Sequence, residues 1–169
     1  MNPADEIVNI VDREDTVIGS LPRHRMRAEN RIHRATFILV FNSRGELFVQ
    51  KRSMTKDVYP GYYDIAAGGV VLADESYETS AQRELHEELG ISGADLMYCF
   101  DFYFEDQDNR VRGRVYTCVY DGDITLQTEE IDSGAFIDPD QCLRMNAVRP
   151  LTPDGIYVLK RFLLERSRD

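Results

Sequence analysis

The chain has 169 residues, of which 43% are hydrophobic and 30% are charged, enough for one sizeable core. Its 30 acidic and 20 basic residues give a net charge of −10, which excludes unspecific attraction to nucleic acid polymers or to an anionic membrane surface. The three cysteines are odd in number and widely spaced, so they predict neither a disulfide framework nor a zinc site. Residues 1–6 lack a signal-type pattern, and we expect a soluble cytoplasmic protein.

The first thirty residues predict a small β-hairpin followed by a connector. Apolar patches at 7–11 and 17–18 flank the polar turn 12–15, and residues 23–34 form a basic connecting stretch. We expect one domain over residues 1–169, with the hairpin and connector in 1–30 and the main fold in 31–169.

The middle of the chain alternates β-prone runs with one clear helix. Runs at 36–41 and 47–50 predict a hairpin, and 62–67 predicts a further strand that ends at Gly68 and Gly69. Asp74 and Glu75 stand where a helix N-terminus is expected, and Gly90 stands where one ends. The intervening helix is predicted to bury three apolar residues, Ala81, Leu85 and Leu89.

The last third predicts two more strands, at 97–104 and 111–120, around a polar turn. A short helix begins at 138–140, and residues 154–166 carry apolar side chains at helical spacing. Strands mixed with a few helices predict an α/β sandwich, in which helices cover both faces of one sheet.

The middle helix carries three glutamates on one face. At 100° per residue, Glu84, Glu87 and Glu88 fall within an arc of about 100°, beside the buried stripe. Like charges at this spacing destabilise an isolated helix, whereas a divalent cation would turn them into a binding site. Carboxylates without cysteine or histidine suit Mg²⁺ or Mn²⁺. The alternative is an ordinary solvated acidic helix face.

The spacing around these glutamates resembles the complete 23-residue box of the Nudix hydrolase family. Gly69 is followed after five residues by Glu75, then after seven by Arg83-Glu84, and the helix closes with Gly90 and Ile91. The resemblance implies a Nudix-type α/β/α sandwich with a mixed sheet. It also implies a divalent-metal-dependent hydrolase that cleaves a diphosphate linkage in a nucleoside diphosphate linked to another moiety, and a homodimer is a reasonable expectation.

The same resemblance implies roles for individual residues of the box. It assigns Glu84, Glu87 and Glu88 as ligands of Mg²⁺ (or Mn²⁺), with a backbone carbonyl near Gly68 or Gly69 as a further oxygen. Arg83 joins them in the catalytic set. Glu87 also lies four residues from Arg83, so an ion pair that orients the helix is a second role for it. Glu75 is expected at the helix terminus rather than on the metal.

The general base is left open between a box glutamate and a carboxylate of a later loop. Glu129 and Glu130 are the late candidates, and Glu130 is preferred because an exposed turn is expected for Glu129.

A second resemblance covers residues 32–69, which are similar to the isopentenyl-diphosphate isomerase branch of the Nudix superfamily. The matching arginine and lysine hold the diphosphate in that branch, which implies substrate binding by Arg52 and Lys56. The isomerase cysteine is missing, since the chain reads Ala67-Gly68-Gly69. Arg112-Gly113-Arg114 replaces the isomerase's Glu-x-Glu pair.

Arg112 and Arg114 point to the same side of a strand, where they either contact the substrate or only solubilise the surface. The chain's histidines are expected at the surface or in loops and not on a metal: His24, His33 and His86. The chain is interpreted as a hydrolase that acts on a small-molecule nucleotide or diphosphate. An isomerase-like enzyme and a non-catalytic nucleotide- or diphosphate-binding regulator remain as alternatives.

Overall fold

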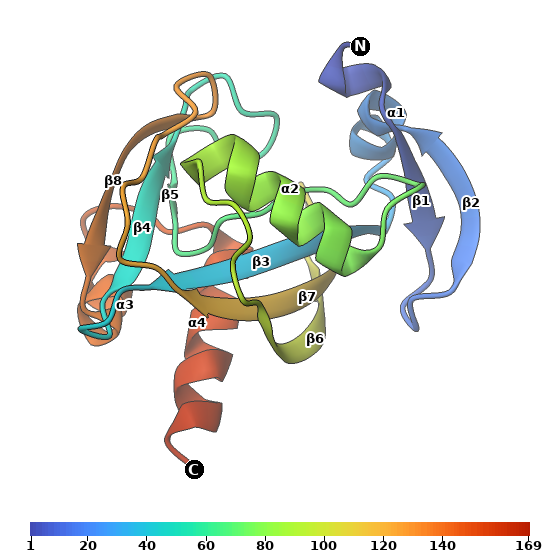
Figure 1. The fold of residues 1–169 in the computed structure, drawn as a ribbon. Helices are drawn as coiled ribbons and strands as arrows, with labels where there is room; N and C mark the ends of the chain where they lie inside the picture. The colour runs from blue at the N-terminus through green and yellow to red at the C-terminus, as the bar shows by residue number, and fades with distance from the viewer.

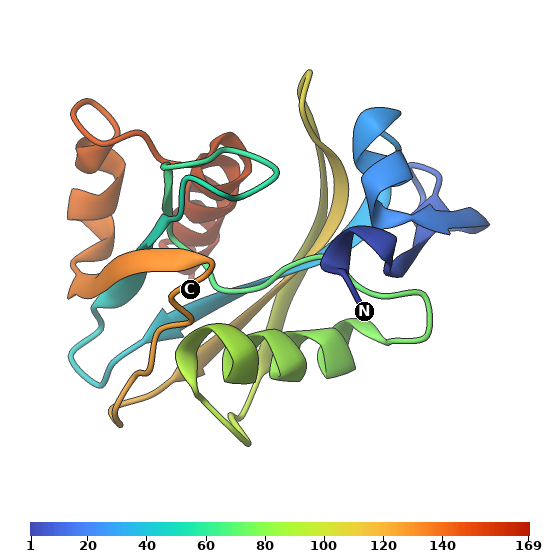
Figure 2. The same ribbon diagram turned by 90° about the horizontal axis from the view of Figure 1, so that it is seen from above.

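The computed structural model describes residues 1–169 and shows three layers, a mixed eight-stranded sheet between helices (Figure 1). Helix α2 (Tyr77–Leu89) covers one face, while α3 (Pro139–Met145) and α4 (Pro153–Arg166) cover the other, as Figure 2 shows from above. The strands are β1 (Ile7–Val11), β2 (Val17–Pro22), β3 (His33–Phe41), β4 (Leu47–Arg52), β5 (Tyr63–Asp64), β6 (Met97–Glu105), β7 (Arg110–Val119) and β8 (Ile131–Ile137). The predicted α/β sandwich with helices on both faces is therefore confirmed.

The centre of the sheet is the parallel pair β3 and β7, in register from His33 opposite Val111 to Phe41 opposite Val119. Every other strand pair is antiparallel. The hairpin β1–β2 joins the same sheet through a single pairing, Ile10 with His33. The sheet is thus mixed, and the N-terminal hairpin lies at the end of β3 where that strand begins.

Strands β3 and β4 diverge immediately after their turn. They pair only at Phe41 and Leu47, after which β4 pairs with β8 and β5 instead. The chain after β5 fills part of the wedge, since Ala67 bridges to Ile38 and Val70 bridges to Ala35. Several buried polar residues lie in this wedge between the two halves of the sheet, among them Thr36, Asp64, Thr152 and Asp154.

Two hydrophobic cores hold the layers together. Alternate residues of β3 face opposite sides: Phe37 and Leu39 pack toward α3 and α4, whereas Ile38 and Val40 pack toward α2. The α2 residues predicted to be buried, Ala81, Leu85 and Leu89, are all fully buried. This packing fixes the rotation of α2, and with it the direction of the glutamates beside the buried stripe.

The ends of α2 are set by two residues. Ser76 is the N-cap, and its hydroxyl accepts a hydrogen bond from the Thr79 N–H at 3.1 Å. The prediction that Asp74 and Glu75 mark the N-terminus is therefore early by one or two positions. Gly90 ends the helix with φ +69°, a conformation that glycine adopts without steric cost.

Three features of the fold differ from the sequence prediction. The basic stretch 23–34 contains helix α1 (Arg23–Ala28), because its one buried apolar residue, Met26, packs into a small core with β1. The predicted strand 62–67 is ladder-paired only at Tyr63–Asp64, and strand β8 was not predicted.

The cysteines are free, as expected: Cys118 and Cys142 are buried and Cys99 is partly buried. None of the helices combines the length and the apolar character that crossing a membrane requires.

Candidate active site

Two glutamates of α2 are buried against the wedge. Glu84 is 9% exposed and Glu88 is 3% exposed, one helical turn apart on the face beside Leu85. Glu87 lies at the edge of this face, with 46% of its side chain exposed. Buried carboxylates are rare without a partner, so this pair marks a specialised site rather than a solvated acidic face.

Arg83 connects the box residues to one another. Its guanidinium donates to both carboxylate oxygens of Glu75, at 2.6 and 3.1 Å, and to Glu84 Oε1 at 3.0 Å. It also donates to Glu87 Oε2 at 3.1 Å and to the Val70 carbonyl at 3.4 Å. Arg83 therefore fixes Glu84 in place, and the ion pair predicted between Arg83 and Glu87 is present. Glu75 precedes the helix and orients Arg83.

Burial controls the protonation of the two inner glutamates. Loss of water raises the pKa of Glu84 above its ordinary value, although the Arg83 charge opposes the change. The pKa of Glu88 is raised further, first by burial and then by the neighbouring Glu84 charge. The opposing Lys56 charge does not offset these causes. Two carboxylates in this position are therefore short of positive charge, which a divalent cation would supply.

The loop Gly68–Gly69 passes close to Glu84. A Cβ atom on Gly69 would lie 2.6 Å from Glu84 Oε1, so only glycine lets the backbone approach this carboxylate. Gly68 has φ +133°, and a Cβ there would overlap the Thr36 carbonyl oxygen. Gly69 thus lets the backbone lie against Glu84, and its own carbonyl accepts a hydrogen bond from the Thr36 N–H at 3.0 Å. The role of a carbonyl of this loop as a metal ligand stays a prediction.

A buried glutamine adds another oxygen to this group. Gln50 on β4 donates from Nε2 to Glu88 Oε2 at 3.0 Å, while its own Oε1 is buried without a hydrogen-bond donor. No three carboxylate, imidazole or thiol side chains converge into a closed ligand set. The oxygen-only donors of Glu84, Glu88 and the glycine loop nevertheless fit a hard divalent cation better than zinc.

Glu130 and two basic residues lie on the other wall of the wedge. Lys56 donates to Glu130 Oε2 at 2.8 Å, and the pKa of Glu84 and that of Glu88 are both influenced by these two charges. Arg52 donates to Asp64 Oδ2 at 2.7 Å and to the Val58 carbonyl. Glu129 is exposed, and its carbonyl accepts from Ser53 and Thr55. Of the two late carboxylates, Glu130 is therefore the one near the α2 glutamates.

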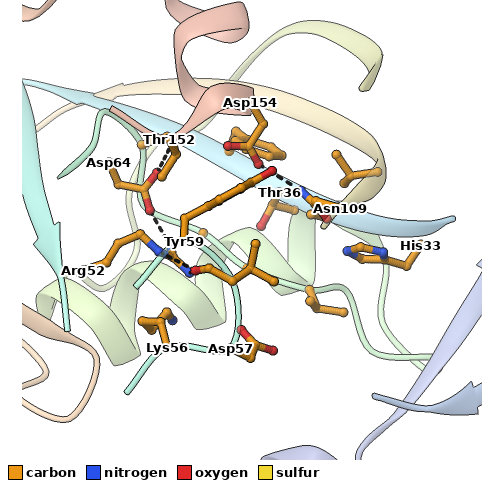
Figure 3. A pocket seen from close by; sticks show the side chains of 18 of the residues that line it. His33, Thr36, Arg52, Lys56, Asp57, Tyr59, Asp64, Asn109, Thr152 and Asp154 are labelled. Atoms are coloured by element: carbon orange, nitrogen blue, oxygen red, sulfur yellow. Dashed lines mark hydrogen bonds and ion pairs between the residues drawn. The ribbon is translucent and has the colours of Figure 1, made fainter. Parts of the chain in front are cut away.

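A cavity of about 80 Å³ lies in the wedge, with polar residues from several elements on its walls (Figure 3). Arg52, Lys56, Gly68 and Gly69 all line it, which places the predicted substrate-binding and loop residues at one site. Lys56 also borders a neighbouring groove of about 460 Å³ that contains Glu130.

Several further residues of this cavity were not predicted as site residues. Arg27 of α1 donates to Asp57 Oδ2 at 3.1 Å and to Asn109 Oδ1 at 3.2 Å, and Asn109 in turn donates to Asp154 Oδ2 at 3.3 Å. His33 lies against Arg27, with 3.4 Å between Nε2 and Nη1. The one sequence pattern that could have indicated these residues was the four-residue spacing of Arg23 and Arg27, which places both on one face of a helix.

The expectation that His33 lies at the surface or in a loop is wrong. It begins β3, is 2% exposed, and its pKa is lowered to about 3 by burial and then by the Arg27 charge. The uncharged ring fills space between the hairpin and β7 because Ile10 and Val111 flank it in the sheet. His24 and His86 are exposed, as expected.

Arg112 and Arg114 lie elsewhere. Arg114 donates two hydrogen bonds to Asp101, at 2.8 and 3.0 Å, and stacks 4.3 Å above Tyr77 at the start of α2. Seven residues of helix, about 10 Å, separate Tyr77 from Glu84. Arg112 is partly buried, and its Nε has no acceptor. Neither arginine lines the cavity, so their substrate-binding role stays a prediction.

Comparison with known families identifies this arrangement. The family model described as the NUDIX domain matches residues 31–162. The chain belongs to the Nudix hydrolase family. It is 46% identical over 158 residues to an uncharacterized Nudix hydrolase of Pseudomonas aeruginosa, with 94% of each chain covered. It is also 39% identical over 164 residues to the Nudix hydrolase YfcD of Escherichia coli, covering 97% of this chain and 90% of that one.

Solved structures show the same Nudix fold. The crystal structure of DR0079 from Deinococcus radiodurans is similar with a TM-score of 0.81 and 26% identity, covering 92% of this chain and 98% of that chain. A MutT protein from Methanosarcina mazei gives a TM-score of 0.69 at 23% identity, over 80% and 95% of the two chains. The fold of both structures agrees with the α/β/α sandwich expected for the family.

Proposed function

We propose that this Nudix hydrolase cleaves a diphosphate linkage in a nucleoside diphosphate linked to another moiety, with Mg²⁺ or Mn²⁺ as cofactor. The observation that supports this most is the buried pair Glu84 and Glu88 beside the Gly69 backbone. A structural role alone does not account for two like charges in a low-dielectric position, one helical turn apart.

The proposed cation ligands are Glu84, Glu87 and Glu88, with a carbonyl oxygen of Gly68 or Gly69. A cation bound there would lower the pKa of water and neutralise phosphate oxygens. Arg83 keeps Glu84 oriented through its hydrogen bond, and Gln50 does the same for Glu88. These contacts hold the carboxylates ready before the substrate arrives, which limits the cost of reorganisation.

The opposite wall supplies substrate contacts and a base. Lys56 and Arg52 present positive charge to the substrate phosphates. We assign Glu130 as the general base, because its carboxylate lies in the neighbouring groove and accepts a hydrogen bond from Lys56. When a phosphate draws Lys56 away, the Glu130 carboxylate becomes free to accept a proton from water.

The isomerase alternative lacks its reactive group. Ala66, Ala67 and Gly68 line the cavity where the isomerase branch has its cysteine, and no thiol is among the cavity's lining residues. The similarity to the isomerase-like subgroup is a proposal that concerns only residues 32–69. We do not propose that the chain catalyses the isomerase reaction.

A panel of nucleoside diphosphate compounds, assayed with and without Mg²⁺, tests the proposal. We expect Mg²⁺-dependent release of a nucleoside monophosphate, reduced more than about a hundredfold in Glu88→Gln. Glu78→Gln, which changes an exposed glutamate of the same helix, is the matched control and should retain activity. Binding without turnover would instead support a regulator, and allylic isomerisation without phosphate release would support the isomerase.

A further inference from the structure

The cavity in the wedge contains three carboxylates that the proposed hydrolysis does not use, and only one of them, Asp154, has no ion-pair partner. Asp154, in the first turn of α4, is 8% exposed and lines the cavity wall opposite Lys56 and Asp57 (Figure 3). It comes from the C-terminal part of the chain, whereas the cation-binding residues come from α2 and the preceding loop. Its role is therefore separate from that of the α2 glutamates.

Asp154 differs from the other two aspartates of the cavity in having no ion-pair partner. Asp57 pairs with Arg23 and Arg27, and Asp64 pairs with Arg52. Asp64 also accepts from the Thr152 hydroxyl at 3.0 Å, so both of its oxygens have partners. Asp154 accepts only from two neutral donors, the Gly155 N–H at 2.8 Å and the Asn109 amide at 3.3 Å.

A carboxylate with two neutral donors retains acceptor capacity, since its two oxygens offer about four lone-pair sites. Burial raises the pKa of Asp154 to about 6 and the charge of Asp64 adds to this effect, while the Arg52 charge and the hydrogen-bonding groups of Gly155 and Thr152 oppose it only in part. A ligand that donates a hydrogen bond would relieve this unfavourable burial. A ligand oxygen without a proton would meet a like charge instead.

The position of Asn109 fixes the direction of the hydrogen bonds in this cavity. Its carbonyl oxygen accepts from Arg27 and its amide donates to Asp154, so a chain of contacts runs from Asp57 through Arg27 and Asn109 to Asp154. One wall of the cavity therefore carries Lys56 beside Asp57, which pairs with Arg23 and Arg27, and the opposite wall carries the acceptor Asp154 beside the ion pair of Arg52 and Asp64 (Figure 3). A molecule with a phosphate for Lys56 and an amino group for Asp154 matches these two walls.

We propose that Asp154 is a specificity-determining residue, which accepts a hydrogen bond from an amino group on the non-phosphate part of the substrate. This inference rests on the proposed hydrolase function and deepens it. The amino group belongs either to a nucleobase or to an aliphatic amine, because both present N–H donors, neutral in the nucleobase and cationic in the amine.

Binding to the full-length protein tests the inference without turnover. Calorimetry in EDTA at pH 8 compares ADP with purine riboside 5′-diphosphate, which lacks only the amino group. A second pair, phosphoethanolamine and ethyl phosphate, makes the same comparison for an aliphatic amine. We expect wild type to prefer the amino compound of at least one pair by about tenfold or more, as for a hydrogen bond to a charged acceptor.

Asp154→Asn should reduce that preference to less than about threefold. Asp140→Asn, at an exposed aspartate of α3 whose side chain makes no hydrogen bond, is the control and should keep it. Asp154→Ala serves as a second variant if the asparagine variant does not fold.

The two pairs identify the source of the amino group. A preference within the ADP pair assigns a nucleobase, and one within the phosphoethanolamine pair assigns an aliphatic amine. Equal binding of both members in both pairs overturns the inference, as does a preference that survives in the Asp154 variants. Failure of Mg²⁺-dependent hydrolysis in the compound panel would remove the proposed function but leave this binding result unchanged, so the two failures are distinguishable.

Discussion

Replacement of Asp154 by asparagine should make the protein more stable at neutral pH but not at acidic pH. The pKa of Asp154 is raised from its ordinary value of 3.8 to about 6 by burial, and then by Asp64. As pH rises from about 4 to about 6, the unfolded chain releases the Asp154 proton while the folded chain retains it. The unfolded state then binds fewer protons, so this group lowers stability as pH rises.

The size of the effect follows from the two pKa values. At ~1.4 kcal/mol per pKa unit, the difference corresponds to ~3 kcal/mol of lost stability well above pH 6, which falls to ~0.6 kcal/mol at pH 4 and vanishes only well below 3.8. Asparagine does not ionise, so this loss disappears in the variant. Any change in hydrogen bonding to Asn109 or Gly155 adds a constant offset of ~1 kcal/mol that does not depend on pH.

Urea unfolding of wild type and Asp154→Asn at several pH values between 4 and 8 measures the pH-dependent loss of stability that is due to Asp154. The difference in unfolding free energy, variant minus wild type, should increase by ~2.4 kcal/mol between pH 4 and pH 7. Glu84 and Glu88 are present in both proteins, so their raised pKa values cancel in the difference. A difference that stays flat across this range would show that Asp154 is not a buried, uncompensated charge, and the binding argument built on it would lose its basis.

Three other changes test separate parts of the site. His33→Gln should remove a loss of stability on acidification. Because the pKa of His33 is about 3 in the folded protein and 6.5 ordinarily, only the unfolded chain takes up this proton between pH 6.5 and pH 4. Wild type should therefore lose ~3 kcal/mol more unfolding free energy than the variant between pH 7 and pH 4, and equal losses would contradict this. Gly69→Ala should displace the Glu84 carboxylate, because the alanine Cβ would lie 2.6 Å from it. The Mg²⁺ concentration for half-maximal hydrolysis should then rise by about tenfold or more. An unchanged Mg²⁺ titration curve would refute the close approach. Arg83→Gln should lower kcat at saturating Mg²⁺ by about tenfold or more with little change in KM, and a change in KM alone would show that Arg83 does not position Glu84.

The α2 segment was predictable from sequence because its information is local. Leu85 and Leu89 set which face is buried, and Glu84 and Glu88 follow at fixed angles beside them. The packing of α2 against β3 preserved that geometry. The Arg83 to Glu87 contact was likewise predictable from a spacing of four residues.

The cavity was not predictable in the same way, because its residues meet only through long-range pairing. Asn109 lies in a polar turn and Asp154 follows a proline at a helix start, patterns that are typical of turns and caps. Their contact depends on how α4 packs on β6 and β7. Strand β8 was missed because Gly134 and exposed neighbours weaken its alternation, and pairing with β4 compensates for that. Helix α1 has no side-chain cap and is stabilised by Met26 alone among its buried residues.

The single pairing between β3 and β4 has an evolutionary consequence. The carboxylates that we propose as cation ligands belong to α2, while the residues that we propose to contact the rest of the substrate lie on loops and helix ends around the wedge. Substitutions on those loops alter ligand choice without disturbing the packing that orients Glu84 and Glu88. Proteins with this framework can therefore change their substrate specificity during evolution while the arrangement of the α2 carboxylates stays the same.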